Sequence, residues 1–205
     1  MNPNTSVQFF EEQFQRQIAA QVCELNPFEH AALPHLRGKV LDYGCGMGNL
    51  AVMAARQGCS VVALDGSHAA IEHLRGLATR EALPVVAQEA DLRTHELTEK
   101  FDAVVCIGLL MFFDCPTAYH KLEELQLHLR PGGIVIVNVL TEGTTYMDMF
   151  SPEGHCLFKK DELPKRFVGW DIVRVEHQEF PAPANTRKAF VTVIARKPHD
   201  TPAGV

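Results

Sequence analysis

Residues 40–50, with the sequence VLDYGCGMGNL, constrain the fold of this chain more than any other segment. Two apolar residues and Asp42 come first. Glycines then occupy every second position (Gly44, Gly46 and Gly48), and a helix-forming run, LAVMAAR, follows. This order predicts a buried strand, a tight turn and the start of a helix. Glycine accepts positive φ and lacks the Cβ that would keep a ligand off the turn, while the helix start presents unpaired N–H groups.

The spacing of the acid and the glycines also indicates the kind of ligand. A dinucleotide-binding turn reads G-x-G-x-x-G, whereas this turn reads D-x-G-x-G-x-G. A carboxylate at Asp42 would repel a pyrophosphate and attract an ammonium or sulfonium group. That attraction is worth about 4 kcal/mol at ~4 Å and an effective dielectric constant near 20. The turn therefore favours a ligand with a cationic group over a dinucleotide.

Acidic residues end two further apolar runs. Asp65 lies about 20 positions after Gly44, where nucleoside-binding sheets place a carboxylate on the ribose hydroxyls. Asp91 follows a third run and can accept a hydrogen bond from an exocyclic adenine amine. Each acid alone is also compatible with a helix cap or a solvated loop, and Asp65 can simply begin the next helix. All three behind one glycine turn indicate a nucleoside site.

Strands and helices alternate along the chain, which predicts an α/β fold. Ligands of such sheets bind beyond the carboxyl ends of the strands, where the three acids stand. The last two strands have no helix between them and can form an antiparallel pair. The pair Asn26-Pro27 is expected to end the first helix, because the residue before a proline disfavours the helical conformation. The predicted strands are 39–43, 60–65, 85–88, 102–107, 134–140, 171–175 and 189–195, and the predicted helices are 7–25, 49–57, 67–80, 116–129 and 161–167.

Residues 35–197 resemble the class I S-adenosylmethionine-dependent methyltransferases, through the segments VLDYGCGMGNL, SVVALDGS, EADL and FDAVVCIG. The resemblance implies a doubly wound, seven-stranded, mostly parallel Rossmann-like sheet with helices on both faces and an antiparallel last strand inserted into it. It implies S-adenosylmethionine as cofactor, with the glycine turn at the methionine part. Asp65 is expected at the ribose, and Asp91 with Leu92 at the adenine. The expected cofactor-binding residues are Asp42, Gly44, Cys45, Gly46, Gly48, Asp65, Gly66, Asp91, Leu92 and Cys106.

A closer resemblance concerns the acceptor. Residues 105–113, 130–133, 162–170 and 190–197 resemble the TehB-like tellurite-resistance methyltransferases. That family methylates soft oxyanions such as tellurite and selenite, and related enzymes methylate thiols. The resemblance thus implies methyl transfer to a small-molecule acceptor, either a chalcogen oxyanion or a thiol. Members carry His and Arg between the last two strands, where this chain reads HQEFPAPANTRK and its histidine does not align.

Three segments are expected to face the acceptor: the N-terminal helix, residues 108–114, and residues 141–156, a connection long enough to form a lid. The candidate catalytic residues are Tyr146, His155 and Arg187. Arg187 can pair with an oxyanion, although a strand-edge arginine is equally compatible with solvation, and His155 can simply cap the lid. Cys45 is either a thiol activated at a helix start or a small packing residue. Whether a general base takes part stays open.

The composition indicates one domain, residues 1–197, with an N-terminal helix at about 5–25 over the site and a loose tail at 198–205. A net charge of −6 disfavours a nucleic-acid partner. The sequence shows no signal peptide or membrane-spanning run, so we expect a cytoplasmic protein with no membrane contact.

Six widely spaced cysteines without a C-x-x-C pair are expected to be free thiols in a reducing compartment, with no metal site. A homodimer is one candidate assembly. Two other functions compete with methyl transfer: a non-catalytic S-adenosylmethionine-binding sensor, and a nicotinamide-dependent oxidoreductase on a similar sheet.

Overall fold

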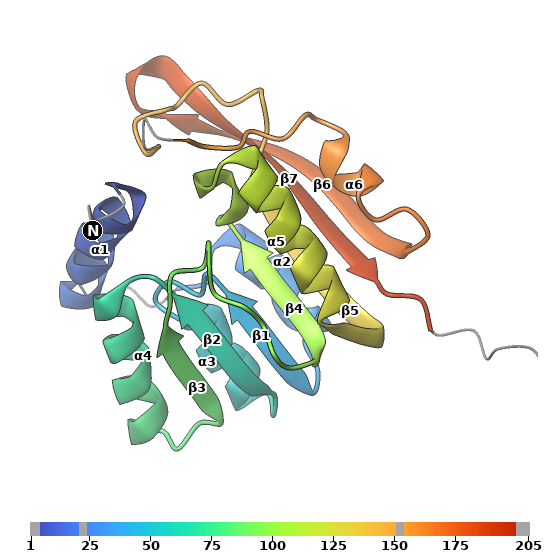
Figure 1. The fold of residues 1–205 in the computed structure, drawn as a ribbon. Helices are drawn as coiled ribbons and strands as arrows, with labels where there is room; N and C mark the ends of the chain where they lie inside the picture. The colour runs from blue at the N-terminus through green and yellow to red at the C-terminus, as the bar shows by residue number, and fades with distance from the viewer. Residues whose placement is uncertain (1–4, 21–23, 151–153, 200–205) are drawn as a thin grey trace, which may run out of the picture.

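The computed structural model describes residues 5–20, 24–150 and 154–199, built around a seven-stranded sheet (Figure 1). The strand order is β3-β2-β1-β4-β5-β7-β6. Neighbours from β3 to β5 are parallel, while β7 is antiparallel to both β5 and β6. The predicted sheet and its inserted antiparallel last strand are therefore confirmed. The strands are β1 Lys39–Tyr43, β2 Ser60–Asp65, β3 Val85–Glu89, β4 Phe101–Ile107, β5 Leu129–Leu140, β6 Asp171–Ala182 and β7 Thr186–Arg196.

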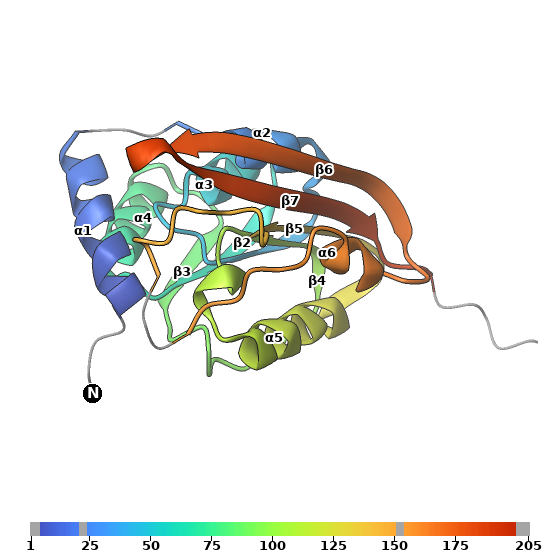
Figure 2. The same ribbon diagram turned by 90° about the horizontal axis from the view of Figure 1, so that it is seen from above.

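Helices cover both faces of the sheet (Figure 2). Helices α5 and α6 pack on one face, and α2, α3 and α4 pack on the other. Helix α1 stands apart from both layers, beyond the carboxyl ends of the first strands (Figure 1). The α-helices are α1 Thr5–Ala19, α2 Pro27–Ala32, α3 Asn49–Arg56, α4 His68–Arg80, α5 Cys115–Leu127 and α6 Glu162–Lys165, and the 3-10 helices are Leu33–His35, Leu110–Phe112 and Pro183–Asn185.

The central strand β4 shows why its sequence is apolar almost throughout. Its side chains alternate between the two faces: Val104 and Cys106 belong to the core under α5, and Ala103 and Val105 to the core under α3 and α4. All four are fully buried. A parallel strand covered on both faces has no solvated side, so it reads as a continuous hydrophobic run.

Some boundaries differ from the prediction. Helix α1 ends at Ala19, before the predicted Leu25, and residues 21–23 lie outside the described residues. The pair Asn26-Pro27, interpreted as a helix end, begins α2, because Asn26 caps that helix and Pro27 is its first residue. Strand β6 runs to Ala182 rather than to residue 175, since it pairs with β7 along its whole length.

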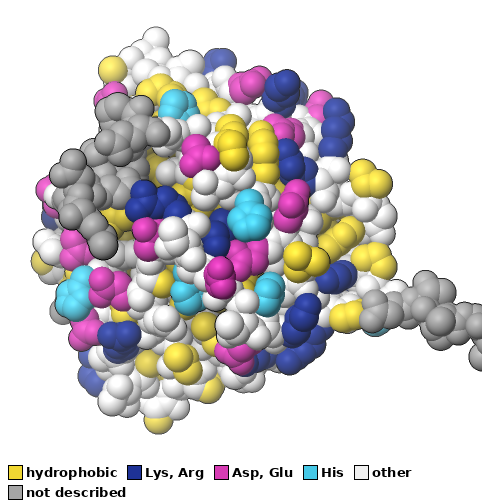
Figure 3. Space-filling view, viewed as in Figure 1, with side chains coloured by type: hydrophobic (Ala, Val, Ile, Leu, Met, Phe, Trp, Pro, Cys, Tyr) yellow, Lys and Arg dark blue, Asp and Glu magenta, His cyan; other side chains and the backbone are white. Residues whose placement is uncertain are grey.

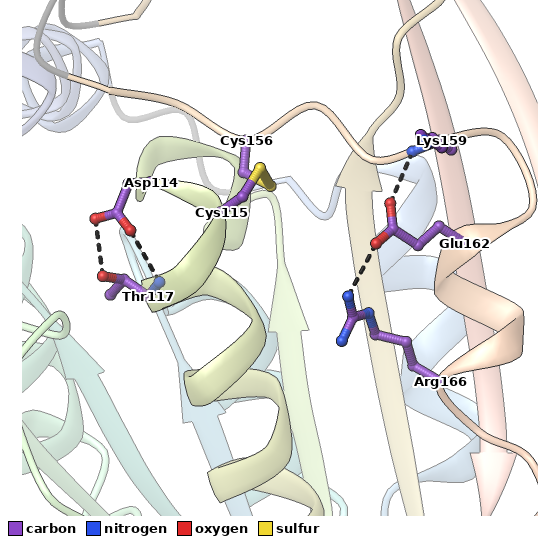
Figure 4. The surroundings of a disulfide bond; sticks show 7 residues. All are labelled: Asp114, Cys115, Thr117, Cys156, Lys159, Glu162 and Arg166. Atoms are coloured by element: carbon purple, nitrogen blue, oxygen red, sulfur yellow. Dashed lines mark hydrogen bonds and ion pairs between the residues drawn. A yellow bond between two sulfur atoms is a disulfide. The ribbon is translucent and has the colours of Figure 1, made fainter.

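Two cysteines correct the prediction that all six are free. Cys115 at the start of α5 forms a disulfide with Cys156 in the segment after β5, with a Cα–Cα distance of 4.7 Å (Figure 4). The segment is held there because the Cys156 N–H donates to the Met111 carbonyl (3.0 Å). The two cysteines are 41 positions apart, so no local spacing could reveal the bond. The remaining described cysteines are free and buried; Cys23 lies outside the described residues.

On the face drawn in Figure 3, acidic, basic and histidine side chains are interspersed. No helix among residues 5–20, 24–150 and 154–199 has both the length and the apolar character needed to cross a bilayer. The described part of the chain also holds no group of three His, Cys, Asp or Glu side chains placed to bind a metal ion. Most of the predicted tail, residues 200–205, lies outside the described residues.

Candidate functional site

A cavity of about 530 Å³ lies beyond the carboxyl ends of β1, β2 and β4. The strand order changes direction between β1 and β4, and open α/β sheets bind their ligands at such a switch point. The size is within the ~300–1,000 Å³ range of small-molecule sites. The walls come from α1, from residues 24–29, from the glycine turn after β1 and from the segments that follow β2, β3 and β4. We call it the main cavity.

The glycine turn forms one wall of the main cavity at Gly44 and Gly46. Both have positive φ, +83° and +50°. A Cβ on Gly44 would lie 3.0 Å from the Leu109 side chain, and one on Gly46 would lie 3.1 Å from the ring of Phe14. Because neither glycine has a side chain, the backbone of the turn faces the cavity, and the side chains of Leu109 and Phe14 pack directly against it.

Asp42 lies in the floor of the main cavity and is only 5% exposed. Its Oδ2 atom is buried and has no hydrogen-bond partner among the described residues. Burial raises the pKa of Asp42 to about 8, and the negative charges of Glu29 and Asp65 act in the same direction. At neutral pH this carboxyl group is therefore mostly protonated until a cation approaches it.

Asp65 ends β2 and joins the glycine turn to the next helix. Its Oδ2 accepts the Gly46 N–H (2.8 Å) and its Oδ1 accepts the Ser67 N–H (2.9 Å). Burial raises the pKa of Asp65, although these N–H groups act against that rise. Helix α4 is capped by Ser67, whose hydroxyl accepts the Ala70 N–H (3.2 Å). Asp65 is thus not the cap of α4, and it lines the cavity together with Gly66.

Asp91 and Leu92 form the opposite wall, after β3. The Asp91 carboxylate pairs with Arg93 at 2.8 and 3.0 Å, and this guanidinium hydrogen bond lowers the pKa of Asp91. The buried Tyr43 hydroxyl donates to the Leu92 carbonyl (2.6 Å) and fixes the loop. The three predicted acids therefore line one cavity.

Comparison with known proteins agrees with this geometry. Residues 40–133 match the family described as a methyltransferase domain. The chain is 30% identical over 166 residues to hemagglutinin 1 of Eikenella corrodens, and 34% over 131 residues to a carboxy-S-adenosyl-L-methionine synthase of Vibrio parahaemolyticus. These matches cover 78% and 61% of this chain and 55% and 51% of the relatives, so the chain spans about half the length of the curated relatives it matches.

Solved structures share the fold. TehB from Haemophilus influenzae superposes with a TM-score of 0.75 at 19% identity, over 88% of this chain and 65% of TehB. The N-methyltransferase NodS from Bradyrhizobium japonicum superposes with a TM-score of 0.68 at 17% identity, over 93% of this chain and 99% of NodS. Residues 40–133 therefore match a methyltransferase domain, and the chain has the class I methyltransferase fold.

Helix α1 covers the main cavity of this methyltransferase domain. Phe10 and Phe14 line the cavity, and Phe10 packs edge-on against Phe112, with ring centroids 4.9 Å apart. Glu11 fastens the helix, because its carboxylate accepts the Ser67 hydroxyl and the Ala69 N–H at the start of α4. Burial opposes ionisation of Glu11, but these hydrogen bonds lower its pKa overall.

Three residues that were expected to bind the cofactor differ from the others in their surroundings. Gly48 does not line the cavity; it precedes α3 with φ +74°, and a Cβ there would lie 2.5 Å from Leu74. Cys106 points into the core under α5. Cys45 does line the cavity, but burial raises its pKa well above the usual value, so its thiol is neutral and packs rather than reacts.

The three candidate catalytic residues lie outside the cavity lining. His155 stacks on Phe150, with ring centroids 4.7 Å apart. The ammonium of Lys188 lies 4.9 Å from the ring centroid of Tyr146. The Arg187 Nε donates to the Gly143 carbonyl (3.0 Å). The structure thus brings the three acids, Gly44 and Gly46 together at the cavity, whereas Tyr146 and His155 lie in the connection after β5 and Arg187 lies at the start of β7.

Glu29 on α2 is a cavity residue that sequence reasoning missed. Its signal was present as the capping-box pattern N-x-x-E at Asn26. We interpreted that segment as the end of α1 and so did not place an acid near Asp42.

Proposed function

We propose that this chain is an enzyme that transfers a methyl group from S-adenosylmethionine to a small-molecule acceptor. One observation carries the proposal: three carboxylates and an open glycine turn line a single cavity at the switch point of a methyltransferase fold. Two comparisons support the same ligand. One relative is named for a carboxylated form of this cofactor, and the NodS structure was solved with S-adenosylhomocysteine.

The residues present fit the cofactor. The partnerless Oδ2 of Asp42 suits the ammonium of the methionine part, and the turn at Gly44 and Gly46 presents bare backbone to the cavity for its chain. Asp65 would accept from the ribose hydroxyls, since its carboxylate lines the cavity and has about four lone-pair sites, of which the N–H groups of Gly46, Gly66 and Ser67 use three. Asp91 would accept from the adenine amine beside Leu92.

When bound, the cofactor supplies a methyl group already activated on a cationic sulfur. The work of the protein is then to position the acceptor and to exclude water. Phe10, Phe14 and Phe112 line the cavity, and α1 covers it. We assign these side chains to the acceptor end, where an apolar wall removes water.

Of the two acceptor classes, the charges favour a thiol over an oxyanion. Among the described residues that line the cavity, Arg93 is the one cation, and it already pairs with Asp91. A hydrated oxyanion such as tellurite would lose its water in an aromatic enclosure that also holds Glu24 and Glu29. A thiol carried on an apolar group would not bear that cost, and part of it ionises near neutral pH.

A methyl-transfer assay tests the proposal. Isothermal titration calorimetry should show binding of S-adenosylhomocysteine but not of NAD. Radiolabelled S-adenosylmethionine should then transfer its methyl group to aromatic thiols faster than to tellurite or selenite. Binding without transfer to any acceptor would favour the sensor, and NAD binding alone would favour the oxidoreductase. Failure of S-adenosylhomocysteine to bind would refute the proposal.

The assembly and the location of the protein stay predictions. Light scattering in solution measures whether the chain is a homodimer. The disulfide between Cys115 and Cys156 argues against the predicted reducing cytoplasm, where thiol reductants keep most cysteines reduced.

A further inference from the structure

We propose that Glu29 is a second carboxylate for the ammonium group of the cofactor: together with Asp42 it holds that group, and the pair releases a proton as the ammonium binds. The inference rests on the proposed function and adds to it a binding residue and a pH dependence. It concerns the floor of the main cavity, where α2 meets the end of β1.

The fold presents Glu29 to the cavity in a fixed orientation. Asn26 Oδ1 accepts the N–H groups of Phe28 (2.9 Å) and Glu29 (3.0 Å), and Glu29 Oε2 accepts the Asn26 N–H (2.7 Å). This capping box holds one carboxylate oxygen. The other oxygen, Oε1, makes no hydrogen bond within the described residues, and the side chain lines the main cavity. One oxygen thus serves the helix while the other can serve a ligand.

Asp42 supplies the second half of the pair. It is nearly inaccessible, it lines the same cavity, and its buried Oδ2 has no partner among the described residues. Glu29 and Asp42 line the same cavity, and the negative charge of Glu29 raises the pKa of Asp42 more than the charge of Asp65 does. Two carboxylates that share a site cannot both ionise cheaply. An ammonium between them would satisfy the orphaned oxygen and remove the repulsion.

The groups around Asp42 provide no cation of their own. The charges that shift its pKa are Glu29 on α2 and Asp65 at the end of β2, and both are negative. Cys45 lines the cavity with Asp42 and Cys106 lies in the core under α5, and burial raises the pKa of both thiols, so both are neutral.

Next to Glu29, His30 exerts a weak opposing charge effect, but burial still raises the pKa of Glu29. Among the described residues that line the cavity, Arg93 is the cation, and it pairs with Asp91, so the Glu29 and Asp42 end of the cavity suits the positive charge of a ligand.

The proton balance follows from these charges. In the empty protein at neutral pH the pair holds a proton, because burial and repulsion favour the neutral form of Asp42. When the ammonium binds, that O–H bond breaks and the proton passes to the solvent buffer, while the ammonium keeps its own three protons. Affinity for the cofactor should consequently rise with pH up to about 8, the pKa of Asp42, and then level off.

Calorimetry in buffers with different ionisation enthalpies measures the released proton directly. Titration of S-adenosylhomocysteine at pH 7 should release close to one proton per site. The same titration with 5′-methylthioadenosine, which lacks the amino-acid part, should release close to none. Equal proton release by the two ligands, or none by either, overturns the inference. If S-adenosylhomocysteine does not bind at all, the proposed function fails instead.

Two matched variants identify the partner of Asp42. Glu29→Gln keeps the capping acceptor but removes the charge, so affinity for S-adenosylhomocysteine should fall about ten-fold. Its proton release should also decrease, because Asp42 then ionises more readily before binding. Glu123→Gln, at an exposed position on α5 outside the cavity lining, should change neither quantity. Unchanged affinity for 5′-methylthioadenosine shows that each variant is folded. Wild-type behaviour of Glu29→Gln refutes the assignment.

Discussion

Replacing Asp42 by asparagine should change how the stability of the empty protein depends on pH. The pKa of Asp42 rises from 3.8 to about 8 on folding, chiefly through burial. Between these values the folded state holds a proton that the unfolded state has lost, so this group makes the free energy of unfolding fall as pH rises. Each pH unit is worth ~1.4 kcal/mol per proton, and the interval from pH 5 to pH 8 gives about 4 kcal/mol. The asparagine side chain does not titrate, so the variant loses this slope.

Urea denaturation followed by circular dichroism, at intervals from pH 5 to pH 8 without cofactor, measures the difference. The wild type should lose about 4 kcal/mol relative to Asp42→Asn across that range. Asp114→Asn is a suitable control, because the Thr117 N–H and hydroxyl lower the pKa of Asp114 and keep it ionised throughout. The free energy of unfolding of this control should change with pH in the same way as that of the wild type. Parallel curves for the wild type and Asp42→Asn would refute the reasoning.

Three further perturbations test other parts of the site and the fold. Asp65→Ala should weaken S-adenosylhomocysteine binding about ten-fold or more by calorimetry, and unchanged affinity would remove the ribose assignment. Gly48→Ala should cost about 2–4 kcal/mol of stability, from positive φ and a Cβ 2.5 Å from Leu74, whereas Gly58→Ala, with positive φ but open space, should cost about 1–2 kcal/mol in thermal denaturation. Cys115→Ser should lower the free energy of unfolding by about 3 kcal/mol, and reduced wild type should match it if the disulfide forms in solution.

Local signals were sufficient to predict that the three acids and the glycine turn lie at one cavity. Asp42, Asp65 and Asp91 each end or follow an apolar run, and parallel strands bring their carboxyl ends to one edge of the sheet. Once the alternation of strands and helices was recognised, these acids had to lie near the same cavity. The glycine turn was predictable for the same reason, because its conformation is decided within a few residues.

Long-range geometry was not encoded in any local pattern. The disulfide joins segments that meet only because the chain after β5 returns along α5. Arg187 and His155 were plausible by residue type, yet the bond of Arg187 to Gly143 and the stacking of His155 on Phe150 depend on how that return segment folds. Glu29 was missed because Asn-Pro is both a helix end and a helix start, and only the capping hydrogen bonds decide between them.

The acids that we propose bind the cofactor also destabilise the folded protein when the main cavity is empty. Burial raises the pKa of Glu29, Asp42 and Asp65, so each carboxyl group ionises less easily in the folded than in the unfolded chain. A ligand that binds only the folded state adds stability in proportion to the logarithm of its concentration over its dissociation constant. Part of that gain here would come from relieving the carboxylate repulsion. Cofactor stabilisation should therefore be larger at pH 8, where the empty protein carries the most uncompensated charge, than at pH 5.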